Sequence, residues 1–375
     1  PAPAHYVAPL DLWLYPFPHD PALPALPTVL DAAALTQALQ AALPACQTGA
    51  MELVRSRAIP LRYRPGKRCT LQLDLYLRHR TTGRFCTQRL YGKLYHNTEK
   101  AAAVYDEMHL LTDAVAAKGG ILSLATAVAF LPTLNLVLQA PVAGQPLDLQ
   151  VNRAFAANEP EPKHVAPAVA RAAYALAELH QLAVATDRLR PVATDLTKLS
   201  RRAAKLAAVA PRLGEAMGAL AQRLCDQASQ LAAWGAELCV GHGDCKPSQF
   251  LLDTTQVALL DFDHCGMADP AADVGLFLAT LRQTQVRQQT KSAVRRTGNL
   301  ASSTWLEAHF LHTYAAGRGA PAAFGQRARW YEALALLRKA WRGFARSPWS
   351  PLPALLVEEA WRCLDDVDRE SFNWK

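Results

Sequence analysis

Apolar and polar residues alternate through residues 51–96, and this period of two predicts antiparallel strands. The three expected strands cover about residues 52–63, 69–79 and 84–96. Pro65-Gly66 and Thr81-Thr82-Gly83 supply the turns between them. Apolar residues at helical spacing predict one helix at about residues 99–113 and another at about 31–43. This part of the chain is therefore expected to form an antiparallel sheet with one main helix.

The pattern changes in the remainder of the chain. An apolar strand runs into a Pro- and Gly-rich break at residues 139–147, and helical spacing follows at about 165–182. Two short apolar stretches, 250–252 and 257–260, are typical of a buried hairpin. With 375 residues, 51% of them apolar, the chain is long enough for two lobes with substantial cores. We expect an N-terminal arm and helix at 1–50, a smaller lobe at 51–141 and a larger, mostly helical lobe at 142–375.

One stretch of the chain concentrates chemically useful residues. It reads His-Gly-Asp at 242–244, continues to Gln249, and is followed by Leu-Leu-Asp-Phe-Asp at 259–263. Pro247 prevents a helix here, so the first part is expected to form a loop whose side chains point into a cleft. His-Gly-Asp alone is a common turn sequence, and the interpretation depends on other parts that occur in the right order upstream.

Transfer of a phosphoryl group needs a carboxylate that orients and deprotonates the attacking hydroxyl, and oxygen ligands that hold magnesium. Asp244, in the loop, is the predicted general base. Asp261, at the end of the second short strand, is the predicted metal ligand. Gln249 is expected to assist with the metal through its amide oxygen, and Asp263 is a secondary ligand candidate. The stretch therefore predicts a phosphoryl-transfer centre.

The order of these parts resembles the aminoglycoside phosphotransferase family, whose relatives include choline, methylthioribose and maltose kinases. The residues that match its motifs are His242, Asp244, Gln249, Asp261 and Asp263. Most relatives carry Asn where this chain has Gln249, although maltose kinases resemble it in having Gln. The resemblance implies an α/β (α+β), two-lobed protein-kinase-like fold. It also implies ATP and Mg²⁺ as cofactors and a small-molecule hydroxyl as the acceptor.

The resemblance extends upstream to residues that would bind the nucleotide. Lys93, on the third predicted strand, resembles the lysine that grips the α- and β-phosphates. Glu107, on the next helix, would position Lys93, and Glu99 is the fallback partner. The apolar strand that ends in the Pro- and Gly-rich break resembles the hinge between the lobes. The residues expected there to meet adenine through their main chain are Gln139, Ala140 and Val142.

The turn between the first two predicted strands is basic. Its candidate phosphate-binding residues are Arg64, Gly66, Lys67 and Arg68. Such a tip could fold over the phosphates in place of a glycine-rich loop. An ordinary exposed hairpin with solvated basic side chains explains the same pattern equally well.

Three residues around the motif are expected to be structural. His180 is interpreted as a packed or capping histidine, and Asp269 as the N-cap of a helix. Asp273 is expected to brace the catalytic loop. The prolines and aromatics of residues 1–27 favour an extended arm packed on the surface. A remote alternative for the motif is a zinc site made of His242, Cys245, His264 and Cys265.

The net charge and the cysteine content limit the classes of binding partner and the cellular compartment that the sequence predicts. A formal net charge of +8 favours phosphates, acidic substrates or nucleic acid, but no nucleic-acid motif occurs, so we expect no nucleic-acid partner. A late basic cluster fits a solvated helix face, a mobile lid or part of the acceptor pocket. Its members are Arg282, Arg287, Lys291, Arg295 and Arg296. No apolar run is long enough to span a bilayer, and eight cysteines without Cys-x-x-Cys spacing favour free thiols in a cytoplasmic protein without a membrane partner.

The expected reaction is ATP-dependent phosphorylation of a hydroxyl on a small molecule. The Gln249 parallel with maltose kinases and the aromatics of the C-terminal region favour a sugar or sugar derivative. An aminoglycoside or amino alcohol is the alternative acceptor, although the last hundred residues are not markedly acidic. The competing class is a non-catalytic, nucleotide-binding pseudokinase that serves as a regulatory module. The oligomeric state stays open.

Overall fold

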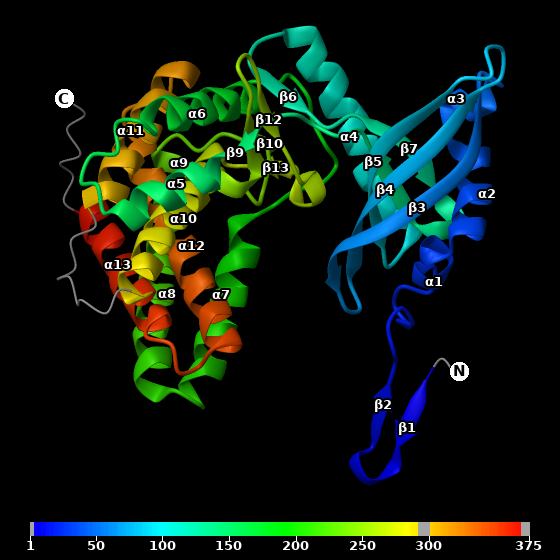
Figure 1. Cartoon of the computed structure of the whole chain (residues 1–375). Coiled ribbons are helices and arrows are strands. Elements are labelled where there is room, and N and C mark those ends of the chain that lie inside the picture. The colour runs from blue at the N-terminus through cyan, green and yellow to red at the C-terminus, as the bar shows by residue number, and fades with distance from the viewer. Residues whose placement is uncertain (1–3, 292–300, 369–375) are drawn as a thin grey trace. The chain divides into compact units, whose positions relative to one another are not determined.

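The computed structural model describes residues 4–291 and 301–368. Arg295 and Arg296 of the late basic cluster lie outside these residues. The chain divides into two compact units (Figure 1). Residues 1–113 and 124–142 form the first unit, and residues 114–123 and 143–375 form the second.

A five-stranded antiparallel sheet is the centre of the first unit, with strand order β3-β4-β5-β8-β7. Its strands are β3 (Met51–Arg64), β4 (Arg68–His79), β5 (Phe85–Tyr95), β8 (Leu136–Gln139) and β7 (Ala127–Leu131). The three strands predicted from the alternation are therefore confirmed, each within two residues of its expected ends. The alternation is clearest along β4, where every second residue from Cys69 to Leu77 is buried and the residues between them are half-buried.

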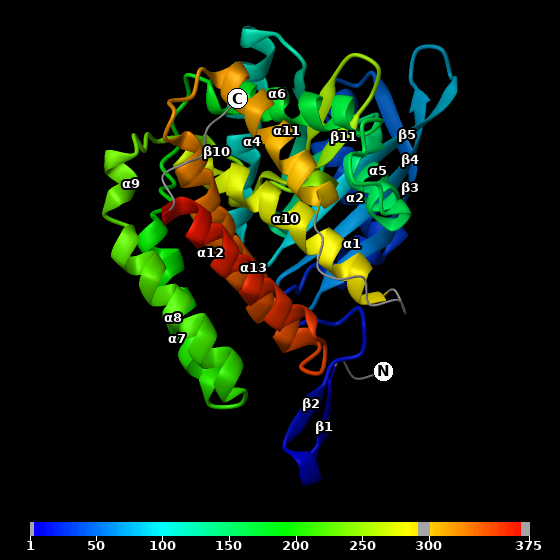
Figure 2. The ribbon, with the colours of Figure 1, turned by 90° about the vertical axis from the view of Figure 1, so that its left-hand side faces the viewer.

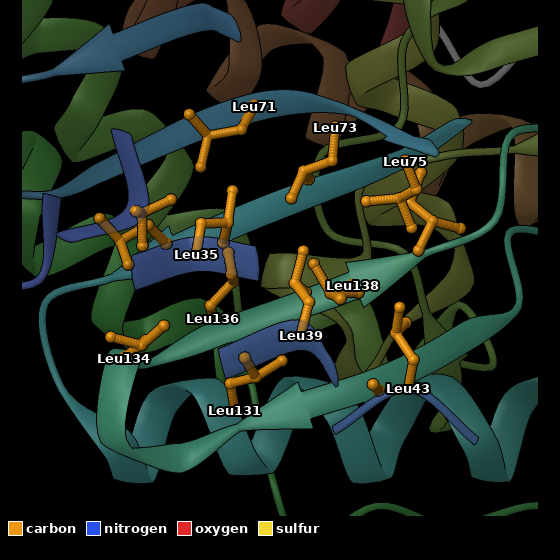
Figure 3. Close-up of a cluster of buried hydrophobic side chains, with 14 of the residues drawn as sticks. Leu35, Leu39, Leu43, Leu71, Leu73, Leu75, Leu131, Leu134, Leu136 and Leu138 are labelled. Atoms are coloured by element: carbon orange, nitrogen blue, oxygen red, sulfur yellow. The ribbon is translucent and has the colours of Figure 1, made fainter. Parts of the chain in front are cut away.

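One face of this sheet packs against two helices, α1 (Leu26–Leu30) and α2 (Ala32–Ala42). Leu71, Leu73 and Leu75 alternate along β4, and all three are fully buried against this layer (Figure 3). Asp31 begins α2, because its carboxylate accepts a hydrogen bond of 2.8 Å from the Ala34 N–H. Leu35, and Leu39 one turn later, then point from this helix toward the sheet.

The opposite face of the sheet carries a second cluster under helix α4 (Thr98–Lys118). Tyr95 and Val137 of the sheet pack in this cluster with Val104 and Met108 of the helix. The helix is longer than the sequence predicts, and it continues from the first unit into the second.

The N-terminal arm differs from the expectation. Residues 5–14 form a small hairpin of β1 (His5–Val7) and β2 (Leu12–Leu14), joined by a single 3-10 turn. Trp13 and Tyr15 are half exposed and Leu10 is 70% exposed, so this part is not packed down as predicted. Only the later part of the arm, where Leu23 is fully buried, joins the core.

The second unit is mostly helical (Figure 2). Its helices are α5 (Leu147–Ala157), α6 (Ala166–His180), α7 (Val192–Ala207), α8 (Pro211–Gln227), α9 (Gln230–Ala233), α10 (Pro270–Lys291), α11 (Ala301–Arg318), α12 (Phe324–Arg346) and α13 (Leu352–Asp368). Helix α12 packs between α10 and α13, and α6 packs on α11. Among the described residues, no helix is long and apolar enough to cross a membrane.

Two small sheets complete the second unit. Strands β6 (Leu122–Leu124), β12 (Val257–Leu259), β11 (Phe250–Leu252) and β9 (Gln145–Pro146) form one sheet in this order. Strands β10 (Cys239–Gly241) and β13 (Gly266–Ala268) form the other. The hairpin predicted from the two short apolar stretches is confirmed as β11 and β12.

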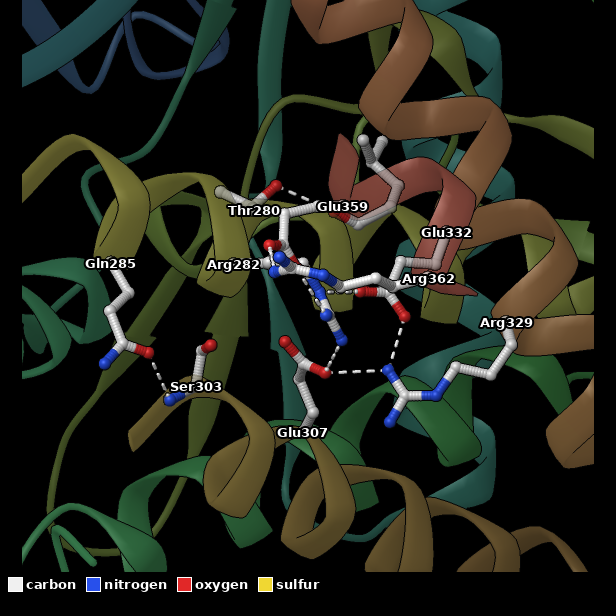
Figure 4. Close-up of polar contacts among 10 residues, drawn as sticks. Thr280, Arg282, Gln285, Ser303, Glu307, Arg329, Glu332, Glu359 and Arg362 are labelled. Atoms are coloured by element: carbon white, nitrogen blue, oxygen red, sulfur yellow. Dashed lines mark hydrogen bonds and ion pairs between the residues drawn. The ribbon is translucent and has the colours of Figure 1, made fainter. Parts of the chain in front are cut away.

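A buried ionic network links four helices of the second unit, and it corrects one interpretation of the late basic cluster. Arg282 of α10 is 7% exposed and donates to Glu307 of α11, Glu332 of α12 and Glu359 of α13 at 2.5–2.9 Å (Figure 4). Arg329 pairs with Glu307 and Glu332 at 2.7 and 2.5 Å. Arg282 is thus neither on a solvated helix face nor part of a lid.

Candidate active site

The predicted catalytic loop lies between β10 and β11 in the second unit. Pro247 was expected to prevent a helix, and the last residues of the loop form only a single 3-10 turn, Pro247–Gln249. The Leu260 peptide fastens this loop to the end of β12: the Leu260 N–H donates to the Gln249 carbonyl at 2.9 Å, and the His242 imidazole pairs with the Leu260 carbonyl at 2.7 Å. These bonds bring Asp261, the next residue, to the loop that carries Asp244.

Asp273 braces the start of the loop from the first turn of α10, as predicted. Its carboxylate accepts hydrogen bonds from the backbone N–H groups of His242 at 2.5 Å and Gly243 at 2.7 Å. His180 contacts the same carboxylate at 3.2 Å, while its other ring nitrogen contacts the Tyr314 hydroxyl at 2.7 Å. Burial would raise the pKa of Asp273, but the hydrogen bond from His180 and the nearby charge of Arg190 help to lower it to about 2. Asp273 is therefore a fixed negative charge beneath the loop.

His242 is buried away from bulk solvent and supports the loop. It is fully buried, and burial lowers its pKa, so the imidazole is neutral. The Nε2–H donates to Leu260, while Nδ1 accepts from the Asp244 N–H at 3.2 Å. Both ring nitrogens are thus used to hold the loop, which leaves the chemistry to the residues after it.

Gly243 is required by the shape of the loop. Its φ of +78° lies in the left-handed region, and a Cβ there would lie 2.0 Å from the Arg190 guanidinium. Arg190 instead approaches closely and donates to the Gly243 carbonyl at 3.3 Å. This packing fixes the direction in which the Asp244 side chain leaves the loop.

Asp244 lies beside a cation and an amide. Lys246 donates to one of its carboxylate oxygens, and Gln249 Nε2 lies 3.3 Å from the same oxygen. Burial alone would raise the pKa of Asp244, but the charge and hydrogen bond of Lys246 hold it below its usual range. The carboxylate is therefore ionised at neutral pH, as a general base must be.

Asp261 faces the same amide from the other side. Gln249 Nε2 lies 3.5 Å from Asp261 Oδ2, so one side chain bridges the two carboxylates. Asp261 has φ +69° and ψ +63°, a left-handed conformation that is uncommon for a residue other than glycine. Asp263 follows on a short 3-10 turn and is buried, and its carbonyl accepts from Arg188 at 2.8 Å. The left-handed residue reverses the chain directly after β12, and this reversal places Asp261 beside the loop.

The donor set suits magnesium better than zinc. In the described parts of the chain, no three His, Cys, Asp or Glu side chains come together as a ligand group. Magnesium usually binds one or two carboxylates and completes its shell with phosphate and water oxygens, so Asp261 with Asp244 nearby fits it. Zinc needs four protein ligands at a structural site. Cys245 and Cys265 are buried free thiols, and burial raises the pKa of Cys245, which disfavours the thiolate that zinc requires.

Lys93 and Glu107, both in the first unit, lie beside the hydrophobic cluster under α4. Lys93 lies on β5 opposite Val137 of β8, and Val137 packs under α4. Residues directly opposite each other point to the same face of a sheet, so Lys93 is on the α4 side. Glu107 lies on α4 next to Met108 of this cluster, and both Lys93 and Glu107 are half-buried.

The predicted hinge residues begin at the last residue of β8, Gln139, and continue beyond it. Gln139 pairs with Tyr91 and Ala127 in the sheet. The Ala140 N–H donates to the Thr126 carbonyl at 2.9 Å, so this group is already used within the unit. Val142 packs against the cluster under α4.

The basic hairpin tip is tied to the N-terminal arm. Asp20 accepts from the Gly66 N–H and the Tyr63 hydroxyl, each at 2.8 Å. Gly66 has φ +68°, as a tight turn requires. Gly66 and Lys67 are exposed, whereas Arg64 and Arg68 are half-buried. Asp20 was missed by the sequence interpretation because it lies more than forty residues before the turn.

Two cations of the site were also missed. Lys246 stands inside the motif, but its contact with Asp244 depends on the backbone of the loop, which the sequence does not specify. Arg190 lies more than fifty residues before Gly243. The signal that could have found it is the glycine itself, because a glycine in a loop motif often marks a close approach by another group.

Comparison with solved structures defines the class of the fold. A choline kinase from Cryptosporidium parvum Iowa II matches with a TM-score of 0.55 at 10% identity, over 90% of this chain and 96% of that one. An ethanolamine kinase from Plasmodium vivax matches with a TM-score of 0.52 at 10% identity, over 88% and 87%. The mixed α+β architecture with antiparallel sheets is therefore the protein-kinase-like fold predicted from the motif.

The family follows from the sequence as a whole. The model of the phosphotransferase enzyme family matches residues 74–311, which is more than half of the chain. The chain therefore belongs to the phosphotransferase enzyme family, and the predicted resemblance is confirmed. No curated protein matches the chain.

Proposed function

We propose that this phosphotransferase uses ATP and Mg²⁺ to phosphorylate a hydroxyl group of a small molecule. The observation that supports it most is the arrangement of Asp244 and Asp261 around Gln249, with Lys246 on Asp244. An ionised carboxylate, a second carboxylate and a cation in one place are the parts that phosphoryl transfer needs.

Each residue has a role in this proposal. Asp244 orients the acceptor hydroxyl and accepts its proton as the oxygen attacks the γ-phosphorus. Lys246 stabilises the negative charge of the transferred group, and its contact with Asp244 keeps the base ionised. Asp261 would hold magnesium, with Gln249 and Asp263 as assisting ligands. Bound magnesium supplies charge neutralisation at the phosphates. Gln249 must then turn its amide, because the nitrogen faces both carboxylates in this structure.

The first unit supplies the nucleotide contacts in this proposal. Lys93 grips the α- and β-phosphates and Glu107 positions it. The tip residues Arg64, Gly66, Lys67 and Arg68 cover the phosphates, and Gln139, Ala140 and Val142 line the adenine site. The Ala140 N–H is used by Thr126, so adenine would meet other main-chain groups at this point. The smaller and larger lobes are proposed at residues 51–141 and 142–375.

A sugar or sugar derivative is the acceptor class that we carry into the tests, because Gln249 parallels the maltose kinases. Choline and ethanolamine are the acceptors named for the two solved relatives, so amino alcohols are the second class to test. A pseudokinase is the competing function. It is motivated by Gln249, whose amide nitrogen rather than oxygen faces the carboxylates, and by the basic hairpin tip that takes the place of a glycine-rich loop.

The melting temperature with and without ligands tests this proposal. A ligand that binds only the folded protein raises the melting temperature, so we expect ATP with Mg²⁺ to raise it and Asp261→Ala to remove most of the shift. Asp226→Ala is the control, because Asp226 is exposed on α8. A shift with ATP that does not depend on magnesium would favour the pseudokinase. No shift with any nucleotide would contradict nucleotide binding.

A further inference from the structure

Two helices of the second unit face the region around the catalytic loop with an excess of positive charge. Helix α10 packs against the end of the loop, and α12 packs on α10. Over their described residues, each helix carries one acidic residue. Asp273 of α10 is committed to the loop backbone, and Glu332 of α12 is committed to the buried network. Neither helix therefore has a carboxylate left for a cationic acceptor.

Lys339 of α12 is the central cation of this region. It is half-buried, and its ammonium donates to the Thr280 hydroxyl at 2.8 Å and the Gln283 amide oxygen at 3.1 Å, both on α10. Both acceptors are neutral. Across residues 4–291 and 301–368, no carboxylate lies within ion-pair distance of Lys339. Its amine is thus held in place by neutral partners and, among these residues, has no carboxylate beside it.

Further basic residues stand near Lys339 on both helices. Arg342 lies one turn further along α12, and Arg287 one turn after Gln283 on α10, and both are exposed. The pKa of Lys339 is lowered to about 7, first by burial and then by the positive charges of Lys246, Arg342 and Arg287, while Asp244 acts in the opposite sense. The same Asp244 acts on Arg338, which already pairs with Asp195 at 3.0 Å. Lys339 is hydrogen-bonded to α10, and α10 packs against the end of the loop that carries Asp244, so the cluster lies on the helix that supports the catalytic loop.

We propose that the acceptor carries an anionic group, a carboxylate or a phosphate, which binds to Lys339, Arg342 and Arg287 while its hydroxyl lies at Asp244. This proposal rests on the proposed function and specifies its substrate class. An anion here relieves the repulsion among three cations, whereas a quaternary ammonium or an aminoglycoside adds to it. Lys246 is not counted in the anion site, because it contacts Asp244 and serves the transferred phosphoryl group.

A set of acceptors that share a hexose ring and differ in charge tests the proposal. The probes are glucose, glucosamine, glucuronate and glucose 6-phosphate, each at equal concentration with ATP and Mg²⁺. We expect kcat/KM to be at least tenfold higher for glucuronate or glucose 6-phosphate than for the other two. The preferred member of the anionic pair distinguishes a carboxylate site from a phosphate site. Equal or better use of glucose or glucosamine would overturn the proposal.

The variant Lys339→Gln links the preference to the residue. We expect the ratio of kcat/KM for the preferred anionic probe over glucose to fall at least tenfold. Arg346→Gln is the matched control, because Arg346 lies exposed in the last turn of the same helix. A purely structural role of Lys339 would lower turnover of both probes together and leave the ratio unchanged, which would contradict the assignment.

A second measurement does not depend on turnover. Pyridoxal 5′-phosphate and pyridoxal both form an imine with a lysine amine, with loss of water, and borohydride reduces it to a stable secondary amine. We expect the phosphate-bearing reagent to label Lys339 at least fivefold more than pyridoxal does, by peptide mass spectrometry, and Arg342→Gln to reduce this difference. Equal labelling by the two reagents would overturn the anion site.

The two proposals fail in different ways. If the protein neither binds nor hydrolyses ATP but labels Lys339 selectively, the anion site stands and the kinase assignment is wrong. If ATP is hydrolysed with dependence on Asp244 and Asp261 but glucosamine is the better acceptor, the kinase assignment stands and the anion site is wrong.

Discussion

Two parts of the second unit gather charged side chains and use them in opposite ways. In the network of Arg282, the three glutamates face guanidinium groups at 2.5–2.9 Å, and none of these four side chains is more than 8% exposed. At the catalytic loop, Asp244 has a single ammonium beside it and keeps 25% of its side chain exposed. The charges of the network neutralise one another, while those of the loop stay accessible to a ligand.

Charged side chains contribute mainly to stability in the Arg282 network and mainly to chemistry at the catalytic loop. A buried charge that loses its partner is costly, so the network is sensitive to any single removal. Carboxylates that lie close together repel each other, so removing one from a site does not destabilise the fold in the same way. Activity and stability should therefore respond to different substitutions within one unit.

The largest effect is expected from Asp244→Asn, which breaks the site and not the fold. Loss of the general base should lower kcat by roughly 10²–10⁴-fold. The melting temperature without ligand should stay within ~2 °C of the wild type, because the side chain is partly exposed. Steady-state kinetics and calorimetry measure both, with Asp226→Asn as the control on α8. Turnover that persists at the wild-type rate would remove Asp244 from the role of base.

Arg282→Met is expected to lower the stability of the fold and to leave the residues of the catalytic loop unchanged. It leaves three buried glutamates with Arg329 as the remaining buried cation described among them. Loss of one partner from a buried ion pair costs about 3–5 kcal/mol. At ~2–4 °C per kcal/mol, the melting temperature should fall by roughly 10 °C. A loss below ~1 kcal/mol would mean that the network contributes little net stability.

Asp273→Asn tests a residue that contributes both to the stability of the fold and to the position of the catalytic loop. A carboxylate with a folded pKa of about 2 and an unfolded pKa near 4 stabilises the protein above pH 4, and this contribution is lost as the pH falls from about 4 to 2. The variant should thus be about 2 kcal/mol less stable at pH 7 and should approach the wild type below pH 4. Urea unfolding across this range provides the measurement, and kcat should fall roughly tenfold as the loop loosens. A stability difference that is constant with pH would contradict the assigned charge.

The smallest effect is expected at the surface of the first unit, where Arg78 pairs with Glu52 at 2.6 Å. These side chains are 47% and 37% exposed, so water and salt screen the pair. Glu52→Gln should change the unfolding free energy by less than ~0.5 kcal/mol. A loss comparable with that of Arg282→Met would show that burial is not what separates the two cases.

Much of this architecture follows from local sequence patterns. The alternation along β4 specifies its buried leucines, and Pro247 with the apolar stretch before Asp261 specifies the loop and the strand that end at the site. In the strands and the loop, the deciding contacts are close in sequence. The brace at Asp273 was predicted differently, from the resemblance of residues 269–273 to the family's turn into a helix, because its partners His242 and Gly243 lie 31 and 30 residues earlier.

The features that were missed depend on partners far along the chain. Arg282 looks like a solvated residue in a Gln- and Thr-rich helix until Glu307, Glu332 and Glu359 approach from three other helices. The exposed aromatics of the N-terminal hairpin were misjudged for the converse reason, since apolar residues alone do not show whether a surface exists to cover them. Pairwise long-range contacts of this kind have no local signature.

The distribution of the free thiols decides how this protein can be labelled. Of the eight cysteines, six are buried, Cys225 is half-buried and Cys86 is exposed. Cys86 lies on β5, the strand that also carries Lys93 seven residues further on. Along an extended strand this separation is roughly 23 Å. A maleimide dye should therefore attach first at Cys86 without any engineered cysteine, at a separation suited to energy transfer with a fluorescent nucleotide if one binds at Lys93 as proposed.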